Sequence, residues 1–348
     1  MPHAADWFAP ATPDAPPRVW VIAELGVNHD GSVERAVALV AAAREAGADA
    51  VKVQRFEPGR LLSNQALLAG YQAGRASDAR DLLRPLVLEL EAMREVRMAA
   101  ARAGLAFVVT PFSLGDVAEL AELGVDAVKL ASPDAVNLPL LRAAAGLGVP
   151  MIVSTGTCEL DELAPAAAML GAHGPGGCLL QCVSAYPTPD AAAALGGITA
   201  LADRFGLPAG YSDHTTSTLT GGLAVAAGAV VLEKHLTHDR TAPGPDHAVS
   251  LEPADFAAYV EHVRRAVAML GPRGKRMLDI ERDVQHVSRQ SLCAVRDLPA
   301  GHTLDRTDLT VKRPGVGIPA AALDATLGRR LARAVKANDL LRPTDLAE

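Results

Sequence analysis

Aromatic residues are scarce in this chain, where Phe, Trp and Tyr together make up 3% of 348 residues. Hydrophobic residues of all kinds make up 49%, so the interior must be built mainly from alanine, valine and leucine. No apolar run approaches the ~20 residues of a membrane-spanning helix, and we expect no membrane segment. The length exceeds one ordinary core and favours a large domain together with a smaller one.

Cysteine is also rare. The four residues Cys158, Cys178, Cys182 and Cys293 form no Cys-x-x-Cys pair. Their spacing suits neither a zinc site nor a disulfide framework, so we expect reduced and mostly buried thiols.

The sequence has no long run of Lys or Arg, and its formal charge is −7. These features argue against nucleic acid as a partner. An anionic substrate would need a local cluster of cations in such a protein. Residues 1–17 are rich in Pro and Ala and have no basic start followed by an apolar core. We therefore predict a flexible tail rather than a signal peptide, and a cytoplasmic protein.

Short β-branched and apolar runs alternate with alanine-rich segments of helical period over residues 18–271. Eight such runs in β/α alternation predict a closed (β/α)8 TIM barrel. The alternative, a doubly wound sheet, usually carries a glycine-rich loop after its first strand, and Glu24-Leu-Gly-Val-Asn-His29 is not one. The predicted strands are Val19–Glu24, Ala50–Gln54, Ala106–Thr110, Ala127–Leu130, Met151–Ser154, Leu179–Cys182, Ala209–Ser212 and Val230–Lys234.

The alternation of apolar runs and helical segments ends after Gly271. Residues 272–287 are predicted to be a linker that begins with a basic hinge, Pro272-Arg-Gly-Lys-Arg276. Residues 288–348 contain short strands and turns, which predict a small β-rich domain. A domain of about sixty residues is near the lower limit for folding alone, so a docking surface would help to stabilise it.

Polar side chains gather at the carboxyl ends of the predicted strands, where the chemistry of a parallel barrel lies. Side chains alternate along a strand, so residues two apart share a face. Lys52 therefore shares a face with Gln54, Ser212 shares one with His214, and Glu233 shares one with His235. A single polar residue at a strand end most often solvates the rim. All eight strands share the pattern, and an unpaired Lys52 would be costly to bury, so we predict a functional site.

His214 and His235 lie on the last two strands, which are neighbours in a closed barrel. Two inward histidines suit a divalent metal such as Mn²⁺, with substrate and water oxygens as further ligands; Mg²⁺ and Co²⁺ are alternatives. Each could instead be a hydrogen-bonded core histidine. A closed zinc site is disfavoured, because no thiolate or carboxylate lies at suitable spacing.

Lysines and hydroxyls at the same strand ends suit a small, dense anion such as phosphate. At ~4 Å and an effective dielectric of ~20, one lysine–phosphate pair gains about 4 kcal/mol before desolvation. Lys52 could equally form a salt bridge with Glu24 or Glu233. The candidate anion ligands are Lys52, Thr110, Lys129, Ser132, Ser154, Ser184 and Ser212.

Several motifs, taken in order, resemble those of the N-acetylneuraminate (sialic acid) synthases and their legionaminic and pseudaminic acid relatives. The matching stretches are Ile22-Ala-Glu-Leu-Gly-Val-Asn-His29, Val51-Lys-Val-Gln54, Thr110-Pro-Phe112, Ser154-Thr-Gly156, Tyr186-Pro-Thr-Pro189, Gly210-Tyr-Ser-Asp-His-Thr215, Glu233-Lys-His235, Gly244-Pro-Asp-His247 and Lys312-Arg-Pro-Gly315. The last of these is similar to the antifreeze-like (SAF) module that ends such chains.

The resemblance implies condensation of phosphoenolpyruvate with an open-chain N-acyl hexosamine such as N-acetylmannosamine, giving a nine-carbon 2-keto acid and phosphate. It implies that His214 and His235 bind the metal and that the protein forms a domain-swapped homodimer. It also assigns phosphoenolpyruvate binding to Lys52, Thr110, Lys129, Ser154, Ser184 and Ser212. It also assigns residues around the acceptor sugar, with Arg313 reaching it from the partner subunit. These residues are Glu24, Gln54, Tyr186, Glu233, Asp246 and Arg313.

The departures from the family pattern fall near the acceptor. They comprise Arg55-Phe-Glu-Pro-Gly-Arg60, the loop Tyr71–Leu83, Ser132-Pro-Asp134 and Thr155-Gly-Thr157. The sequence therefore supports the donor chemistry more strongly than any one acceptor.

In the expected mechanism a metal polarises the acceptor aldehyde, and Glu24 and Glu233 act as general acid and base. Three alternatives stay open. The same chemistry could use another aldehyde in a natural-product pathway. A Schiff-base aldolase could use Lys52, Lys129 or Lys234. The chain could also be a sugar-phosphate-binding protein without turnover.

Overall fold

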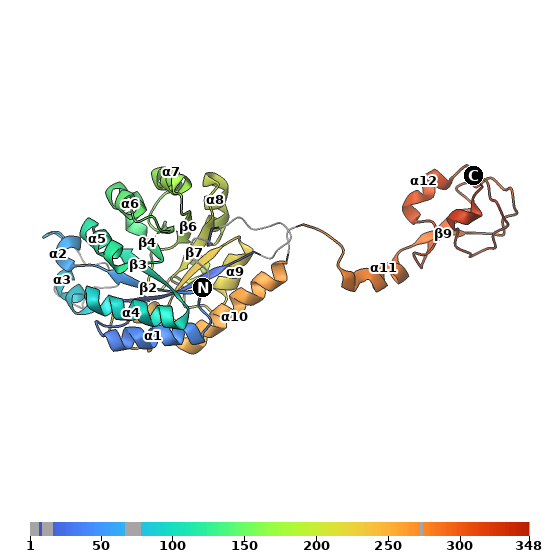
Figure 1. The fold of residues 1–348 in the computed structure, drawn as a ribbon. Helices are drawn as coiled ribbons and strands as arrows, with labels where there is room; N and C mark the ends of the chain where they lie inside the picture. Colours follow the sequence, from blue (N-terminus) through green and yellow to red (C-terminus); the bar gives the residue numbers. More distant parts are fainter. Residues whose placement is uncertain (1–6, 9–16, 67–77, 272–273, 348) are drawn as a thin grey trace. The chain divides into compact units, whose positions relative to one another are not determined.

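The computed structural model describes residues 7–8, 17–66, 78–271 and 274–347 (Figure 1). The chain divides into two compact units, Met1–Arg273 and Gly274–Glu348. Most of the predicted tail, 1–17, and the start of the predicted hinge lie outside the described residues. Among the described residues, no helix is long and apolar enough to cross a membrane.

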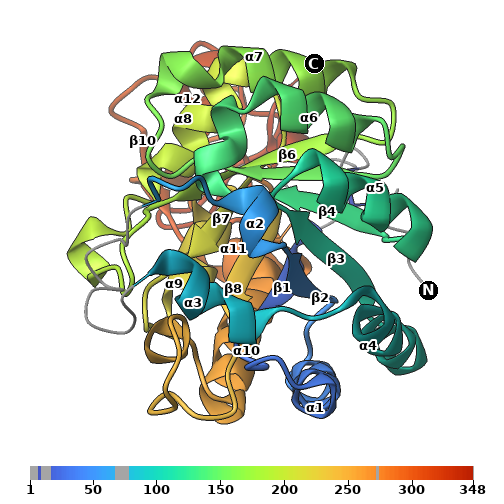
Figure 2. The same ribbon diagram turned by 90° about the vertical axis from the view of Figure 1, so that its left-hand side faces the viewer.

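The first unit is a closed barrel of eight parallel strands in sequential order, so the predicted fold is confirmed (Figure 2). Both ends of each strand lie within two residues of the predicted ends. The strands are β1 Trp20–Gly26, β2 Ala50–Arg55, β3 Ala106–Pro111, β4 Ala127–Leu130, β5 Met151–Ser154, β6 Gly177–Cys182, β7 Ala209–Asp213 and β8 Val231–His235.

Helices surround this barrel and cover the outward side chains of the strands (Figure 2). The main hydrophobic core lies between the two layers and consists largely of Ala, Val and Leu, as the composition requires. The helices are α1 Val33–Glu45, α2 Pro58–Leu61, α3 Ala79–Leu83, α4 Leu90–Ala103, α5 Leu114–Leu123, α6 Leu138–Ala145, α7 Ala164–Ala172, α8 Gly196–Phe205, α9 Thr220–Ala226 and α10 Pro253–Leu270.

A second apolar cluster fills the amino-terminal end of the barrel. It comprises inward side chains from the first residues of the strands, such as Ile22, Ala50 and Val231. Trp7 joins this cluster and stacks on Trp20 with ring centroids 4.9 Å apart. This end of the barrel is therefore closed by apolar side chains, and any polar site must lie at the opposite end.

The second unit is built around a two-stranded antiparallel sheet of β9 Ser291–Ala294 and β10 Leu309–Lys312. Two helices, α11 Arg282–Ser288 and α12 Leu323–Thr326, belong to the same unit. Its own hydrophobic core includes Leu292, Leu304, Leu331 and Leu341. The buried carboxylate of Asp308 ties the turn before β10 together, because it accepts hydrogen bonds from Arg296, His302 and the backbone N–H of Asp305.

Candidate functional site

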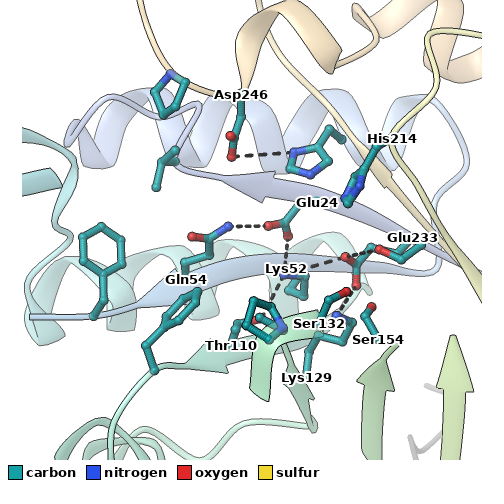
Figure 3. Close-up of a pocket in the computed structure, with 18 of the residues that line it drawn as sticks. Glu24, Lys52, Gln54, Thr110, Lys129, Ser132, Ser154, His214, Glu233 and Asp246 are labelled. Carbon is teal, nitrogen blue, oxygen red and sulfur yellow. Dashed lines mark hydrogen bonds and ion pairs between the residues drawn. The ribbon is translucent and has the colours of Figure 1, made fainter. Parts of the chain in front are cut away.

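A cavity of about 280 Å³ opens at the carboxyl ends of the barrel strands (Figure 3). The predicted site residues line it, with the exceptions of Ser184 and Arg313. They are Glu24, Lys52, Gln54, Thr110, Lys129, Ser132, Ser154, Tyr186, Ser212, His214, Glu233, His235 and Asp246. Side chains that are far apart in the sequence thus meet in one small space because parallel strands end on the same side of a barrel.

Strand alternation and one glycine explain how the polar groups approach one another. Gly26, in a left-handed backbone conformation with φ of +51°, ends β1. A Cβ atom at this position would lie 3.0 Å from Glu24 Oε1 and 3.3 Å from both Asp246 Oδ2 and Gln54 Nε2. Any larger residue would therefore push these three polar groups apart.

Two buried lysines and two buried glutamates form the floor of the cavity (Figure 3). Lys52 Nζ lies 2.9 Å from Glu24 Oε2 and 4.0 Å from Glu233 Oε1, and Lys129 Nζ lies 3.6 Å from Glu233 Oε2. Lys52 also donates to Thr110 Oγ1 at 2.9 Å. The predicted salt bridge of Lys52 therefore exists, and it lies inside the cavity rather than away from it.

The two glutamates have different environments. Burial raises the pKa of Glu24, and the negative charge of Glu233 adds to this effect against the opposing charge of Lys52. Burial would also raise the pKa of Glu233, but the charges of Lys129 and Lys52 outweigh it and lower the pKa. The pKa values of the two carboxyls are thus shifted in opposite directions, as expected where one group serves as general acid and the other as general base.

Hydroxyl groups surround the lysine ends. Ser212 Oγ donates to Glu233 Oε1 at 3.3 Å, and the backbone N–H of Gly156 donates to Ser132 Oγ at 3.0 Å. The hydroxyl of Ser154 is buried and has no hydrogen-bond partner. A buried polar group without a partner is costly in a folded protein, which indicates that a ligand supplies one.

His214 and His235 line the cavity from β7 and β8, which are neighbouring strands, with ring centroids 5.5 Å apart. The Nδ1 atom of His214 lies 2.8 Å from the carbonyl oxygen of Val183, so this nitrogen carries the proton and Nε2 offers a lone pair. Burial lowers the pKa of His235 well below its ordinary value. His235 is therefore neutral near neutral pH.

These two imidazoles fit a metal ion that takes only part of its ligands from the protein. The Nδ1 atom of His235 is buried without a hydrogen-bond partner, 3.9 Å from Asp246 Oδ2. In the described part of the chain, no group of three or more His, Cys, Asp or Glu side chains is placed to hold a metal. A divalent ion at this position would need water or substrate oxygens to complete its coordination.

Three residues considered from the sequence are not among those that line the cavity. Ser184 is exposed, and its hydroxyl lies beside Gly156, where an added Cβ atom would be only 2.4 Å away. Arg313 is an exposed residue of the second unit. Their assigned ligand contacts stay predictions. Lys234 points away from the cavity and pairs with Asp213 behind the strands.

An apolar wall of the cavity was missed by sequence reasoning. It consists of Val27, Phe56, Leu61, Leu83 and Phe112. Leu61 and Leu83 come from α2 and α3, two short helices inserted between β2 and α4. Strand alternation beyond Gln54 and Thr110 could have indicated the two phenylalanines, whereas the short helices carry no clear periodic signal.

Comparison with known proteins agrees with this site. Residues 39–275 match the NeuB family and residues 289–347 match the SAF domain. An N,N'-diacetyllegionaminic acid synthase of Legionella pneumophila is 36% identical over 92% of this chain and 93% of its own length. A mouse N-acetylneuraminate-9-phosphate synthase is 34% identical over 84% and 82% of the two chains.

A solved structure shows the same fold. The N-acetylneuraminic acid synthetase of Leptospira borgpetersenii, in complex with citrate, superposes with a TM-score of 0.69 and 32% identity. The match covers 77% of this chain and 90% of the other.

Proposed function

The chain belongs to the NeuB family and is a phosphoenolpyruvate-dependent sugar acid synthase, and on that premise we propose that its acceptor is the open-chain aldehyde of an N-acyl amino sugar. The product would be a nine-carbon 2-keto sugar acid of the sialic or legionaminic type, with release of phosphate. The main support for this proposal is the composition of the cavity, whose lining includes two lysines, several hydroxyls, two glutamates and two histidines.

The donor would occupy the floor of the cavity. Lys52 and Lys129 are the cations nearest to the hydroxyls of Thr110, Ser132 and Ser154, and this combination suits a phosphate and a carboxylate. Glu233 lies within 4.0 Å of both lysines, so a bound phosphate competes with it for them. Placing both lysines at one donor overcomes the repulsion from a protein of charge −7.

The acceptor would lie above the donor, against Gln54, Tyr186 and Asp246. In a domain-swapped homodimer, Arg313 of the partner subunit would also contact the acceptor. Holding two reactants at van der Waals distance contributes a large share of the rate by itself. This positioning is what the fixed polar groups of β1, β2 and β8 provide.

His214 and His235 are the residues that would hold a divalent metal, with Mn²⁺ the best match to two imidazoles and oxygen ligands. When bound there, such an ion would supply Lewis-acid polarisation of the aldehyde oxygen.

Glu24 and Glu233 are the candidates for proton transfer. The methylene carbon (C3) of phosphoenolpyruvate attacks the aldehyde, and the resulting alkoxide takes a proton from a donor such as Glu24. Positive charge develops at C2, the carbon that carries the phosphate. Water adds to C2 and loses its proton to Glu233, whose pKa is lowered by the two lysines. The C–O bond between C2 and the phosphate then breaks, the hydroxyl proton passes to the leaving phosphate, and the keto acid remains.

One observation favours the alternative of a Schiff-base lysine aldolase. Burial lowers the pKa of Lys129, as a Schiff-base lysine requires, whereas the pKa of Lys52 is raised by Glu233 and Glu24 against the effect of burial. Lys234 is turned away from the cavity and could not serve. Borohydride reduction in the presence of pyruvate would trap a lysine aldolase and leave the proposed synthase unmodified.

The decisive experiment is a phosphate-release assay of phosphoenolpyruvate against a panel of N-acyl hexosamines and other aldehydes. We expect release only when the donor and an amino-sugar aldehyde are both present, and loss of release in Lys129→Met. Release with only non-sugar aldehydes would favour a natural-product pathway. No release with any aldehyde, together with retained phosphoenolpyruvate binding, would indicate a binding protein without turnover.

A further inference from the structure

The apolar wall of the cavity includes a residue from a helix that is too short to hold its own position. Leu61 lines the cavity from α2, whose four residues run from Pro58 to Leu61. The backbone N–H groups of Arg60 and Leu61 both donate to the carbonyl oxygen of Glu57, at 2.9 and 3.0 Å. Isolated helices of fewer than about 12 residues are marginal in water. The position of α2, and with it that of Leu61, must therefore be set by contacts with the rest of the domain.

One carboxylate outside the barrel contacts both ends of the segment that leads into α2. Glu119 of α5 has its Oε2 atom 2.5 Å from Arg55 Nε and its Oε1 atom 2.8 Å from Arg60 Nη1. Arg55 is the last residue of β2 and has the opposite strand parity from Gln54, so its side chain points out of the barrel. Arg55 and Arg60 are also the first and last residues of a stretch that departs from the family pattern. The ion pairs thus join residues at which this chain differs from that pattern.

A buried aspartate extends the ion pairs to the end of β3. Asp116 has no exposed side-chain surface, and its Oδ1 atom lies 3.2 Å from Arg60 Nη1. Its Oδ2 atom accepts a hydrogen bond of 3.3 Å from the backbone N–H of Phe112. The same guanidinium therefore joins α2 to α5 and, through one carboxylate, to the backbone beside the cavity.

The contacts of this network are next to three members of the apolar wall. Phe56 follows Arg55 in the chain, Leu61 follows Arg60, and Phe112 is bound through its own N–H. The rings of Phe56 and Phe112 meet edge to face with centroids 6.2 Å apart. The ion pairs thus lie directly behind the wall that the cavity presents to a ligand.

The network differs from an ordinary surface ion pair, which contributes little to stability. Arg60 is 42% exposed, but Asp116 is fully buried and Arg55 is 6% exposed. Arg60 also lies against the first turn of α5, where a Cβ atom at Gly115 would be 3.1 Å from its Nη1 atom. A hydrogen bond from Arg55, joined by one from Arg60, lowers the pKa of Glu119 against the effect of burial.

We propose, resting on the function proposed above, that Glu119 is a positioning residue for the reaction. It holds α2 against the domain through Arg55 and Arg60, and α2 in turn holds Leu61 at the cavity. Along β2 and its continuation, Phe56 lies one layer beyond Gln54 and two layers beyond Lys52, toward the mouth. A shift of the wall therefore changes the space left for the acceptor and leaves the donor contacts at the lysine floor in place. A misplacement of about 1 Å caused by a distant substitution can lower the rate by as much as a hundred-fold.

The test uses full-length Glu119→Gln. Its amide has one oxygen and one NH2 group, so one of the two arginines would face a donor instead of an acceptor. We expect the KM for the most active N-acyl hexosamine of the phosphate-release panel to rise about ten-fold. The KM for phosphoenolpyruvate should change by about two-fold or less. Glu122→Gln removes the same charge from an exposed position of α5 and should leave both values unchanged.

Equal changes in the KM of both substrates, or equal effects of the two variants, would overturn the inference and leave the proposed function intact. Absence of phosphate release from the wild-type protein with every aldehyde would instead overturn the proposed function.

Hydrogen–deuterium exchange provides a readout that needs no turnover. The amides of Arg60, Leu61 and Leu62 are hydrogen-bonded within the turn of α2. In Glu119→Gln they should exchange about ten-fold faster, while peptides from β7 and β8 keep the wild-type rate. Faster exchange throughout the barrel would show that Glu119 only stabilises the fold, and unchanged exchange at α2 would show that other contacts hold this helix. Either result overturns the inference.

Discussion

Lys234 and Asp213 form an ion pair of 3.1 Å between two side chains with no exposed surface. The two residues are Cα partners on the neighbouring strands β7 and β8, and their side chains point out of the barrel. The preceding pair of partners, Ser212 and Glu233, points into the cavity. Lys234 Nζ also donates to the carbonyl oxygen of Thr215 at 2.5 Å. One buried pair thus holds the backbone on both sides of His214 and behind His235.

We predict that Lys234→Met lowers the free energy of unfolding by about 3–5 kcal/mol, because it leaves the Asp213 carboxylate buried without its charge partner. Urea unfolding followed by circular dichroism measures this change. The matched control is Arg282→Met, which breaks the exposed pair with Asp279 and should cost at most about 1 kcal/mol. Equal effects of the two variants would show that the buried pair has no special role.

Chelation should abolish activity, and Mn²⁺ should restore it. His214→Ala and His235→Ala should each lose bound metal, since neither variant keeps two imidazoles at the cavity. Metal content after gel filtration provides a readout that is independent of turnover, and circular dichroism confirms that the variants are folded. Full activity in excess chelator would contradict this prediction and would favour the lysine aldolase.

Phosphate should leave by cleavage of the C–O bond of phosphoenolpyruvate. In ¹⁸O-labelled water the label should then enter the keto group of the product before exchange and stay out of the phosphate, as rapid-quench mass spectrometry would measure. Label in the released phosphate would mean attack at phosphorus, which the groups placed around the cavity do not explain.

Arg313→Ala should weaken use of the acceptor about ten- to a hundred-fold. A hydrogen bond to a charged group contributes roughly 1.5–3 kcal/mol, at ~1.4 kcal/mol per decade. KM for phosphoenolpyruvate should change little. Arg306→Ala, an exposed arginine of the same unit, is the matched control and should leave both values unchanged.

Mixing His214→Ala with Arg313→Ala subunits tests whether the site is shared between chains. A mixed dimer can hold one barrel with both histidines, covered by a second unit that keeps its arginine, so some activity should return. If exchange of subunits is verified and activity stays at the level of the parents, Arg313 does not act across the dimer.

The second unit should lose stability in acid. Burial would raise the pKa of Asp308, but hydrogen bonds from the Asp305 N–H and His302 outweigh it and lower the pKa. The stabilisation is therefore complete above the unfolded carboxyl pKa of ~3.9 and is lost as pH falls through the lower folded value. Calorimetry of the full chain should show this loss in the wild type and not in Asp308→Asn. A similar acid dependence in both would assign it to other groups.

The sequence was sufficient for the barrel because its strands are buried on both faces, so each forms a continuous apolar run between helical segments. It was also sufficient to bring Lys52, Gln54, His214 and His235 together, since alternation and strand order determine their directions. It did not reveal Leu61 and Leu83, which reach the cavity from short helices whose placement depends on tertiary packing. Ser184 follows β6 and is exposed, with its hydroxyl beside Gly156 and near that of Ser132, so its contact with a ligand stays a prediction.

The stacked pair at the amino-terminal end of the barrel has a practical consequence for spectroscopy. Trp7 and Trp20 are the two tryptophans of the chain, and both belong to the apolar cluster opposite the cavity. Intrinsic tryptophan emission therefore reports on that end of the barrel alone. It will record barrel melting but neither substrate binding nor events in the second unit, so an optical binding assay needs a fluorophore introduced near the strand carboxyl ends.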